Sequence, residues 1–126
     1  MSGFDHIALS FADYATSLAF YESALGPLGI KTLMKFEDDG GKIAGMGAQQ
    51  PIFWVGDGGA VGGRVHIAFQ AKNRAEVDAF YAAAIAAGGK DNGPPGLRTN
   101  YHANYYAAYV FDPDGHNIEA VYQGPV

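Results

Sequence analysis

The sequence predicts an α+β fold of two tandem βαβββ modules, whose strands form a curved mixed sheet around a cleft. The first observation behind this prediction is an internal duplication. When the chain is shifted by 60 positions, residues 4–29 lie over residues 64–89 with nine identities, including His-Ile-Ala and Phe-Tyr. The second is that an alternating segment, a helical stripe and three strand-like segments follow one another in each half. The 126 residues suit one domain made of two half-size units.

Each half opens with a short strand that carries a histidine. In the first strand, Ile7 and Leu9 point to one side and His6 to the other. The second half repeats this alternation around His66. Since the more apolar side should face the helices, both histidines are expected on the uncovered face of the sheet.

A helix follows each opening strand. Asp13 and Asn73 are equivalent in the duplication and are good N-cap residues. Apolar residues recur after both caps at helical spacing. Gly26 with Pro27, and Gly88 with Gly89, provide the helix ends. We therefore expect one amphipathic helix per module, packed on one side of the sheet.

Strand-like segments complete each module. In the first half they cover 30–37, 42–47 and 51–55. In the second half, 105–111 and 117–123 flank the turn Asp112-Pro113-Asp114-Gly115, while 97–101 is a weaker strand after a loop at 94–96. The glycine-rich stretch 56–63 separates the halves, so the predicted boundaries are module 1 at 1–55, a linker at 56–63 and module 2 at 64–126.

Composition excludes several classes of function. The net charge is −5 and no Lys/Arg-rich run occurs, which argues against a nucleic-acid partner. No apolar run approaches the ~20 residues that span a bilayer, and Met1–His6 lacks the pattern of a signal peptide, so we expect a cytoplasmic protein without a membrane partner. The absence of cysteine removes disulfides and thiolate chemistry.

Three side chains on the uncovered face form a candidate metal site. His6 and His66 occupy matching positions in the two modules, and Glu119 faces away from Ile118 and Ala120 in the last strand. Two imidazoles and one carboxylate suit a divalent ion with open positions, namely Mn, Fe, Co, Ni or Zn. The alternative is that these histidines only fill the core or the cleft.

The duplicated βαβββ plan, the His-Ile-Ala strand openings and the closing run from Asp112 to Glu119 resemble the vicinal oxygen chelate superfamily. That group includes glyoxalases, fosfomycin-resistance thiol transferases, bleomycin-resistance proteins, extradiol dioxygenases and methylmalonyl-CoA epimerase. The resemblance covers essentially the whole chain. It implies a divalent-metal enzyme of lyase, transferase or dioxygenase type, whose small-molecule substrate chelates the metal through vicinal oxygens. The alternative that it leaves open is a metal-free protein that binds or sequesters a drug or metabolite.

The resemblance also implies a homodimer in which one chain's first module completes the other's second, with His6 supplied by the partner chain. A fourth ligand position of the superfamily aligns with Phe53 at an offset of 66. Glyoxalases have a carboxylate there that also acts as a base, so glyoxalase activity is disfavoured, and we place Phe53 beside the substrate. The neighbouring Trp54 has the opposite parity and is expected in the core.

The remaining candidates lie near the end of the chain. Tyr105 and Tyr109 should share the cleft face with Glu119, and Tyr109 pairs with Glu119 if Gly115 closes the hairpin as a glycine bulge. His102 and Tyr109 are candidate catalytic residues, and Arg98, Tyr105 and Tyr109 are candidate substrate contacts. A solvated loop position is the alternative for His102 and for Arg98. His116, in the turn, is expected to be exposed.

Overall fold

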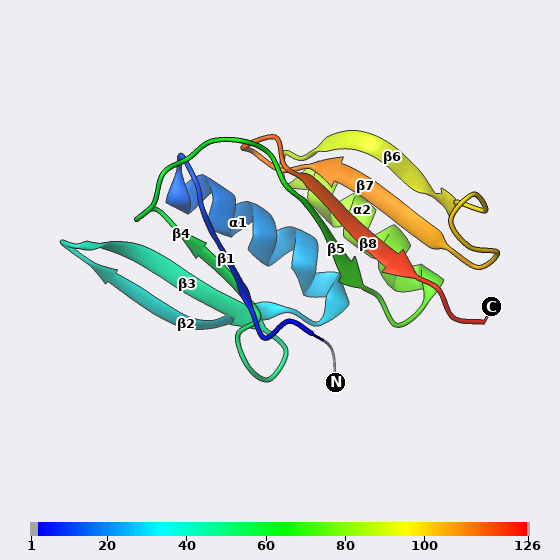
Figure 1. Cartoon of the computed structure of the whole chain (residues 1–126), viewed down its shortest axis with the longest axis horizontal. Helices are drawn as coiled ribbons and strands as arrows, with labels where there is room; N and C mark the ends of the chain where they lie inside the picture. The colour runs from blue at the N-terminus through cyan, green and yellow to red at the C-terminus, as the bar shows by residue number, and fades with distance from the viewer. Residues whose placement is uncertain (1–2, 126) are drawn as a thin grey trace.

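The computed structural model describes residues 3–125 (Figure 1). Residues 1, 2 and 126, at the outer ends of the two predicted modules, lie outside the described residues. The elements in chain order are β1 (Ile7–Ser10), α1 (Tyr14–Leu25), the short 3₁₀ helix η1 (Gly26–Leu28), β2 (Lys31–Asp38), β3 (Gly41–Gly47), β4 (Phe53–Gly56), β5 (His66–Gln70), α2 (Arg74–Ala86), β6 (Lys90–Leu97), β7 (Tyr106–Phe111) and β8 (Asn117–Tyr122). The predicted βαβββ order is confirmed in both halves. Within residues 3–125, neither helix is long and apolar enough to cross a bilayer.

The strands form two four-stranded mixed sheets. Their orders are β1-β4-β3-β2 and β5-β8-β7-β6, and the first and last strands of each module are parallel neighbours. No backbone ladder joins the sheets among the described strands. β1 and β5 instead lie side by side in the middle and run in opposite directions (Figure 1). The rings of Phe53 and Phe69, 5.5 Å apart, pack across this boundary.

The predicted helix starts are confirmed. The Asp13 carboxylate accepts a hydrogen bond from the Thr16 N–H at 3.1 Å, and the Asn73 side chain accepts one from the Glu76 N–H at 2.8 Å. The two helices pack against each other behind the sheets (Figure 1). Their apolar faces and the covered faces of the sheets enclose one core. Within residues 3–125, no helix lies on the opposite face of either sheet (Figure 1).

The predicted loop at 94–96 is wrong, because β6 continues through both prolines to Leu97. β6 is the edge strand of its sheet, where a residue without an N–H is tolerated. Its pairing with β7 shifts between Asp91 and Gly93 and again between Gly93 and Gly96. The segment predicted as a strand at 97–101 is mainly the start of a loop, which the Arg98 N–H closes by donating to the Tyr105 carbonyl at 2.7 Å.

The turn from Asp112 to His116 fastens the two modules together. The Tyr21 hydroxyl donates to the buried Asp112 carboxylate, and the Ala12 N–H donates to Asp114 at 3.0 Å. The expectation that His116 is exposed is wrong, since its side chain is buried edge-on against the Phe11 ring at 5.7 Å. These contacts hold the modules of one chain side by side.

Candidate active site

A histidine and a glutamate meet on the uncovered face of the second sheet. His66 begins β5, and the pairing of Ala68 with Glu119 puts His66 and Glu119 on the same side. Their Nε2 and Oε1 atoms are 2.7 Å apart. The Glu119 side chain is 1% exposed and that of His66 is 52% exposed. The Glu119 carboxylate therefore lies at the bottom of the site, and the His66 imidazole lies at its solvent-exposed edge.

Two tyrosines surround this pair. The Tyr105 hydroxyl donates a hydrogen bond to Glu119 Oε2. Tyr109 is paired with Glu119 across β7 and β8, as the glycine bulge predicts, and Gly115 has a φ of +86°. The Tyr109 ring lies 6.2 Å from the His66 ring. Burial, and next the nearby Glu119 carboxylate, raise the pKa of both tyrosines, so both hydroxyls remain neutral donors at pH 7.

His6 does not join the pair within one chain. Its Nδ1 is 2.7 Å from Asp5, and its side chain is half exposed. It lines a cavity of about 310 Å³ between β1 and β5, whose β5 side runs from Ile67 to Gln70. His6 has no hydrogen bond or ion pair with His66 or Glu119 among the described residues. In residues 3–125, no three imidazole or carboxylate side chains gather as a metal site.

The residue of the first module that is equivalent to Glu119 is Trp54 and not Phe53. Ala8 pairs with Trp54 in the first sheet as Ala68 pairs with Glu119 in the second, so the true offset is 65. The predicted offset of 66 was one residue too long, and a one-residue slip exchanges the two faces of a strand.

Phe53 lies in the hydrophobic core, so the prediction that it contacts the substrate is wrong. Its side chain is 1% exposed, and its ring lies 4.8 Å from that of Tyr21. Trp54 is half-buried on the uncovered face, so the prediction that it lies in the core is wrong. A Cβ atom at Gly45 would lie 2.7 Å from the Trp54 indole, so the missing side chain leaves room for that ring.

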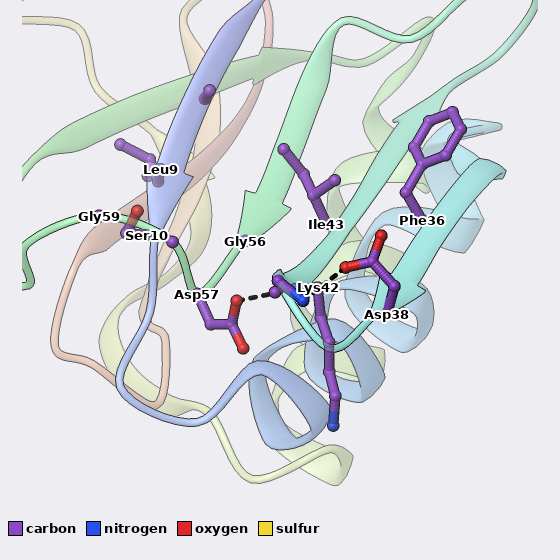
Figure 2. A pocket seen from close by; sticks show the side chains of 13 residues that line it. Leu9, Ser10, Phe36, Asp38, Lys42, Ile43, Gly56, Asp57 and Gly59 are labelled. Atoms are coloured by element: carbon purple, nitrogen blue, oxygen red, sulfur yellow. Dashed lines mark hydrogen bonds between the residues drawn. The ribbon is translucent and has the colours of Figure 1, made fainter.

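The uncovered face of the first sheet is an apolar hollow that the sequence prediction missed. Its volume is about 550 Å³, with Phe36 and Ile43 on its walls and Asp57 among its polar residues (Figure 2). The Asp57 carboxylate accepts a hydrogen bond from the Lys42 N–H at 2.8 Å. The sequence signal that could have predicted this hollow is the alternation of Met34 and Phe36 in the otherwise polar end of β2.

His102 and Arg98 lie in the loop after β6. His102 Nδ1 accepts a hydrogen bond from the Asn104 N–H at 3.0 Å, and its side chain is exposed. The Arg98 guanidinium instead lies over the Tyr109 ring, 5.2 Å from its centre. Arg98 is thus adjacent to the residues around Glu119, whereas His102 is engaged within its own loop.

Comparison with known proteins agrees with the two-module fold and its uncovered faces. A family model described as the Glyoxalase/Bleomycin resistance protein/Dioxygenase superfamily matches residues 3–120. The chain therefore belongs to this superfamily. A glyoxalase/bleomycin resistance protein from Albidiferax ferrireducens T118 is 31% identical, with a TM-score of 0.77 over 98% of this chain and 100% of the other. No curated protein matches the sequence.

Two further solved structures share the fold. Glyoxalase I from Zea mays is 24% identical, with a TM-score of 0.72 over 93% of this chain and 44% of the maize chain. A mutant of the fosfomycin resistance protein FosX from Listeria monocytogenes is 23% identical, with a TM-score of 0.71 over 100% of this chain and 95% of the other. The FosX structure is a complex with Mn(II) and dihydroxypropylphosphonic acid.

Proposed function

We propose that this chain is a divalent-metal enzyme of lyase, transferase or dioxygenase type, acting on a small substrate that binds the metal through two neighbouring oxygens. The observation that carries the proposal is the contact of His66 Nε2 with Glu119 Oε1 at 2.7 Å on an uncovered sheet face. One imidazole and one carboxylate in contact are a donor set that fits Mn, Fe, Co, Ni or Zn. A bound ion would act as a Lewis acid toward a substrate oxygen.

The third protein ligand in this proposal is His6 of the partner subunit in a symmetric homodimer. Support comes from the position of His6, which is half exposed on an uncovered face and pairs with Asp5 and not with His66 or Glu119 of its own chain. The turn from Asp112 to His116 joins the two modules of one chain, and no helix of residues 3–125 covers the outer face of either sheet. A two-fold axis can then set the first module of one chain against the second module of the other.

The chain's own residues have separate tasks in this site. Tyr105 holds one oxygen of Glu119 and leaves Oε1 toward His66. Tyr109 lies beside His66 and, as a neutral phenol, can donate a hydrogen bond to a substrate oxygen. His102 remains a candidate acid or base from the neighbouring loop.

Metal titration combined with subunit mixing tests the proposal. Wild-type protein should bind one divalent ion per chain, and His66→Ala and His6→Ala should each abolish binding without unfolding. An equal mixture of the two variants, refolded together, should regain about a quarter of the wild-type sites, because half of the dimers are mixed and each has one intact site. His102→Ala is the control and should bind normally.

One result would refute the metal enzyme, and two would refute the site shared between chains. Wild-type protein that takes up none of the five metals would remove the basis of the enzyme proposal. A monomer by light scattering at micromolar concentration that still binds metal would show that the site does not need a second chain. Recovery of no sites in the mixture would have the same meaning if both variants dimerise.

A second function is a metal-free binding protein, and the hollow on the first sheet favours it. The cavity of about 550 Å³ has apolar walls, and its charged residues are Asp38, Asp57 and Lys42, so the acidic ones are in excess. This arrangement suits an organic cation with an apolar body. Calorimetry with bleomycin and chelator-treated protein tests it: micromolar binding that His66→Ala leaves unchanged would support sequestration over catalysis.

A further inference from the structure

A polar cavity of about 320 Å³ opens beside Tyr109, and we call it the Arg98 cavity. Its hydrogen-bonding side chains come from one arginine, three asparagines and two tyrosines. These are Asn92, Arg98, Asn100, Tyr101, Tyr109 and Asn117. None of the described residues that line it is acidic. In a chain with 13 acidic and eight basic residues, this is a local concentration of hydrogen-bond donors around one positive charge.

The Arg98 guanidinium is held in position before any ligand arrives. It lies over the Tyr109 ring at 5.2 Å, and its Nη2 donates to the Pro94 carbonyl at 2.7 Å. A Cβ atom at Gly93 or Gly96 would come within 3.1 Å of a guanidinium nitrogen, so both glycines leave room for it. Among residues 3–125, the side-chain ion pairs are His6 with Asp5 and His66 with Glu119, so Arg98 has no carboxylate partner there. Arginine carries five N–H donors, and most of them remain available here.

Two residues connect this cavity to the His66–Glu119 pair. Asn117, on β8, is the direct neighbour of His66 on β5. Its side-chain oxygen is buried and has no hydrogen-bond partner within the described part of the chain. A buried acceptor without a partner points to a donor beside it, such as water or a hydroxyl of a bound molecule. Tyr109 contacts both the Arg98 guanidinium and the His66 ring, so the two sites share a wall.

We propose that the Arg98 cavity binds the anionic head group of the substrate, and that the substrate is a small organic acid. A planar guanidinium fork matches the paired oxygens of a carboxylate or phosphonate. A hydroxyl or carbonyl oxygen next to the acid group would then lie toward His66 and Glu119. This names a substrate class for the proposed enzyme and so rests on the proposed function, but anion binding by the cavity does not itself require metal.

NMR titration of the chelator-treated, full-length chain tests the cavity directly. The probes are glycolate, hydroxymethylphosphonate and the neutral glycolamide, which keeps the shape of glycolate but not its charge. Arg98→Gln removes the guanidinium. Arg74→Gln is the matched control. The Arg74 guanidinium also lies over a tyrosine ring of β7, that of Tyr106 at 4.9 Å, but Arg74 does not line the cavity. At least one acid should shift the Arg98 side-chain signal and bind about tenfold or more tightly than the amide.

Arg98→Gln should weaken acid binding about tenfold or more, and Arg74→Gln should leave it unchanged. The tighter of the two acids identifies the head group. The proposal is overturned if neither acid binds wild-type protein, if the amide binds as tightly as the acids, or if Arg98→Gln binds like wild type. Separate Mn(II) titrations without acid should give equal affinities for wild type and Arg98→Gln. Acid binding by a chain that takes no metal would refute the enzyme and leave the anion site standing.

Discussion

Replacing Tyr105 with Phe tests whether this tyrosine positions Glu119 for a metal ion. In the structure its hydroxyl donates to Glu119 Oε2, and the other carboxylate oxygen contacts His66. The Phe side chain keeps the ring and removes only this donor. With the donor lost, the carboxylate is free to rotate about its last bond, and Oε1 is no longer fixed toward His66. We therefore expect Tyr105→Phe to bind metal more weakly while His66 stays in place.

The size of the expected loss in metal affinity follows from the burial of Glu119. A hydrogen bond to a charged group contributes about 1.5–3 kcal/mol, and water cannot easily replace it at a carboxylate that is 1% exposed. Since about 1.4 kcal/mol corresponds to a factor of ten, the expected loss of metal affinity is about 10–100-fold. The same lost bond should lower the free energy of unfolding of the metal-free chain by about 1.5–3 kcal/mol.

Calorimetric titration with Mn(II) and Zn(II) measures the first quantity, and urea unfolding measures the second. Tyr101→Phe is the control, because its ring lies 5.0 Å from that of Tyr105 but its side chain is exposed. The reasoning fails if Tyr105→Phe binds both metals within twofold of wild type. It also fails if Tyr101→Phe loses as much affinity, since the effect would then come from the tyrosine cluster and not from the bond to Glu119.

Further expectations concern stability and the fourth ligand position. Tyr21→Phe removes the buried bond to Asp112 and should lower the free energy of unfolding by about 1.5–3 kcal/mol in urea; an unchanged midpoint would show that this contact does not fasten the modules. Burial, and next the bond to Glu37, raise the pKa of Tyr14 to about 12, so its contribution to stability is complete below pH 10 and is lost as the pH rises through 12. Tyr14→Phe should therefore flatten the decline in unfolding free energy between pH 10 and 12, and the same slope as wild type would contradict this. Trp54→Glu should fold and bind metal more tightly, whereas Phe53→Glu should unfold the chain; the reverse result would restore the offset of 66. Wild-type protein loaded with Ni, Co, Zn or Mn should be a poor catalyst of thioester formation from the methylglyoxal–glutathione adduct, and turnover of about 1–10³ per second would refute that expectation.

The duplication made most of the fold predictable. Residues that share a role in both halves, such as Asp13 and Asn73, specify local structure through short-range chemistry, and the structure shows both as caps. The same holds for the pairing of Tyr109 with Glu119, because a glycine bulge fixes the register of a tight hairpin. Patterns of this kind depend on neighbours in sequence, and a single chain contains all the information they require.

Other features depend on contacts that the pattern does not encode. His116 looks like an exposed turn residue, but the turn folds onto the first module and buries it against Phe11. Pro94 and Pro95 look like a loop, but an edge strand tolerates them. His6 and His66 have different partners within one chain, and β1 and β5 run in opposite directions, an arrangement that the duplication alone does not determine.

The exchange of Phe53 for Trp54 shows which conclusions depend on register. A one-residue error moved a core side chain into the site and a site side chain into the core, because neighbouring residues of a strand face opposite sides. Neither residue is a carboxylate, so the fourth position lacks a second glutamate in either register. A reaction that moves a proton between adjacent carbons needs a positioned base, whose loss costs about 10²–10⁴ in rate. With an indole at the fourth position, the proposed site has Glu119 as its one carboxylate among the described residues, and Tyr105 already occupies one of its oxygens. This favours reactions in which the metal and hydrogen-bond donors activate the substrate over reactions that need a second glutamate as base.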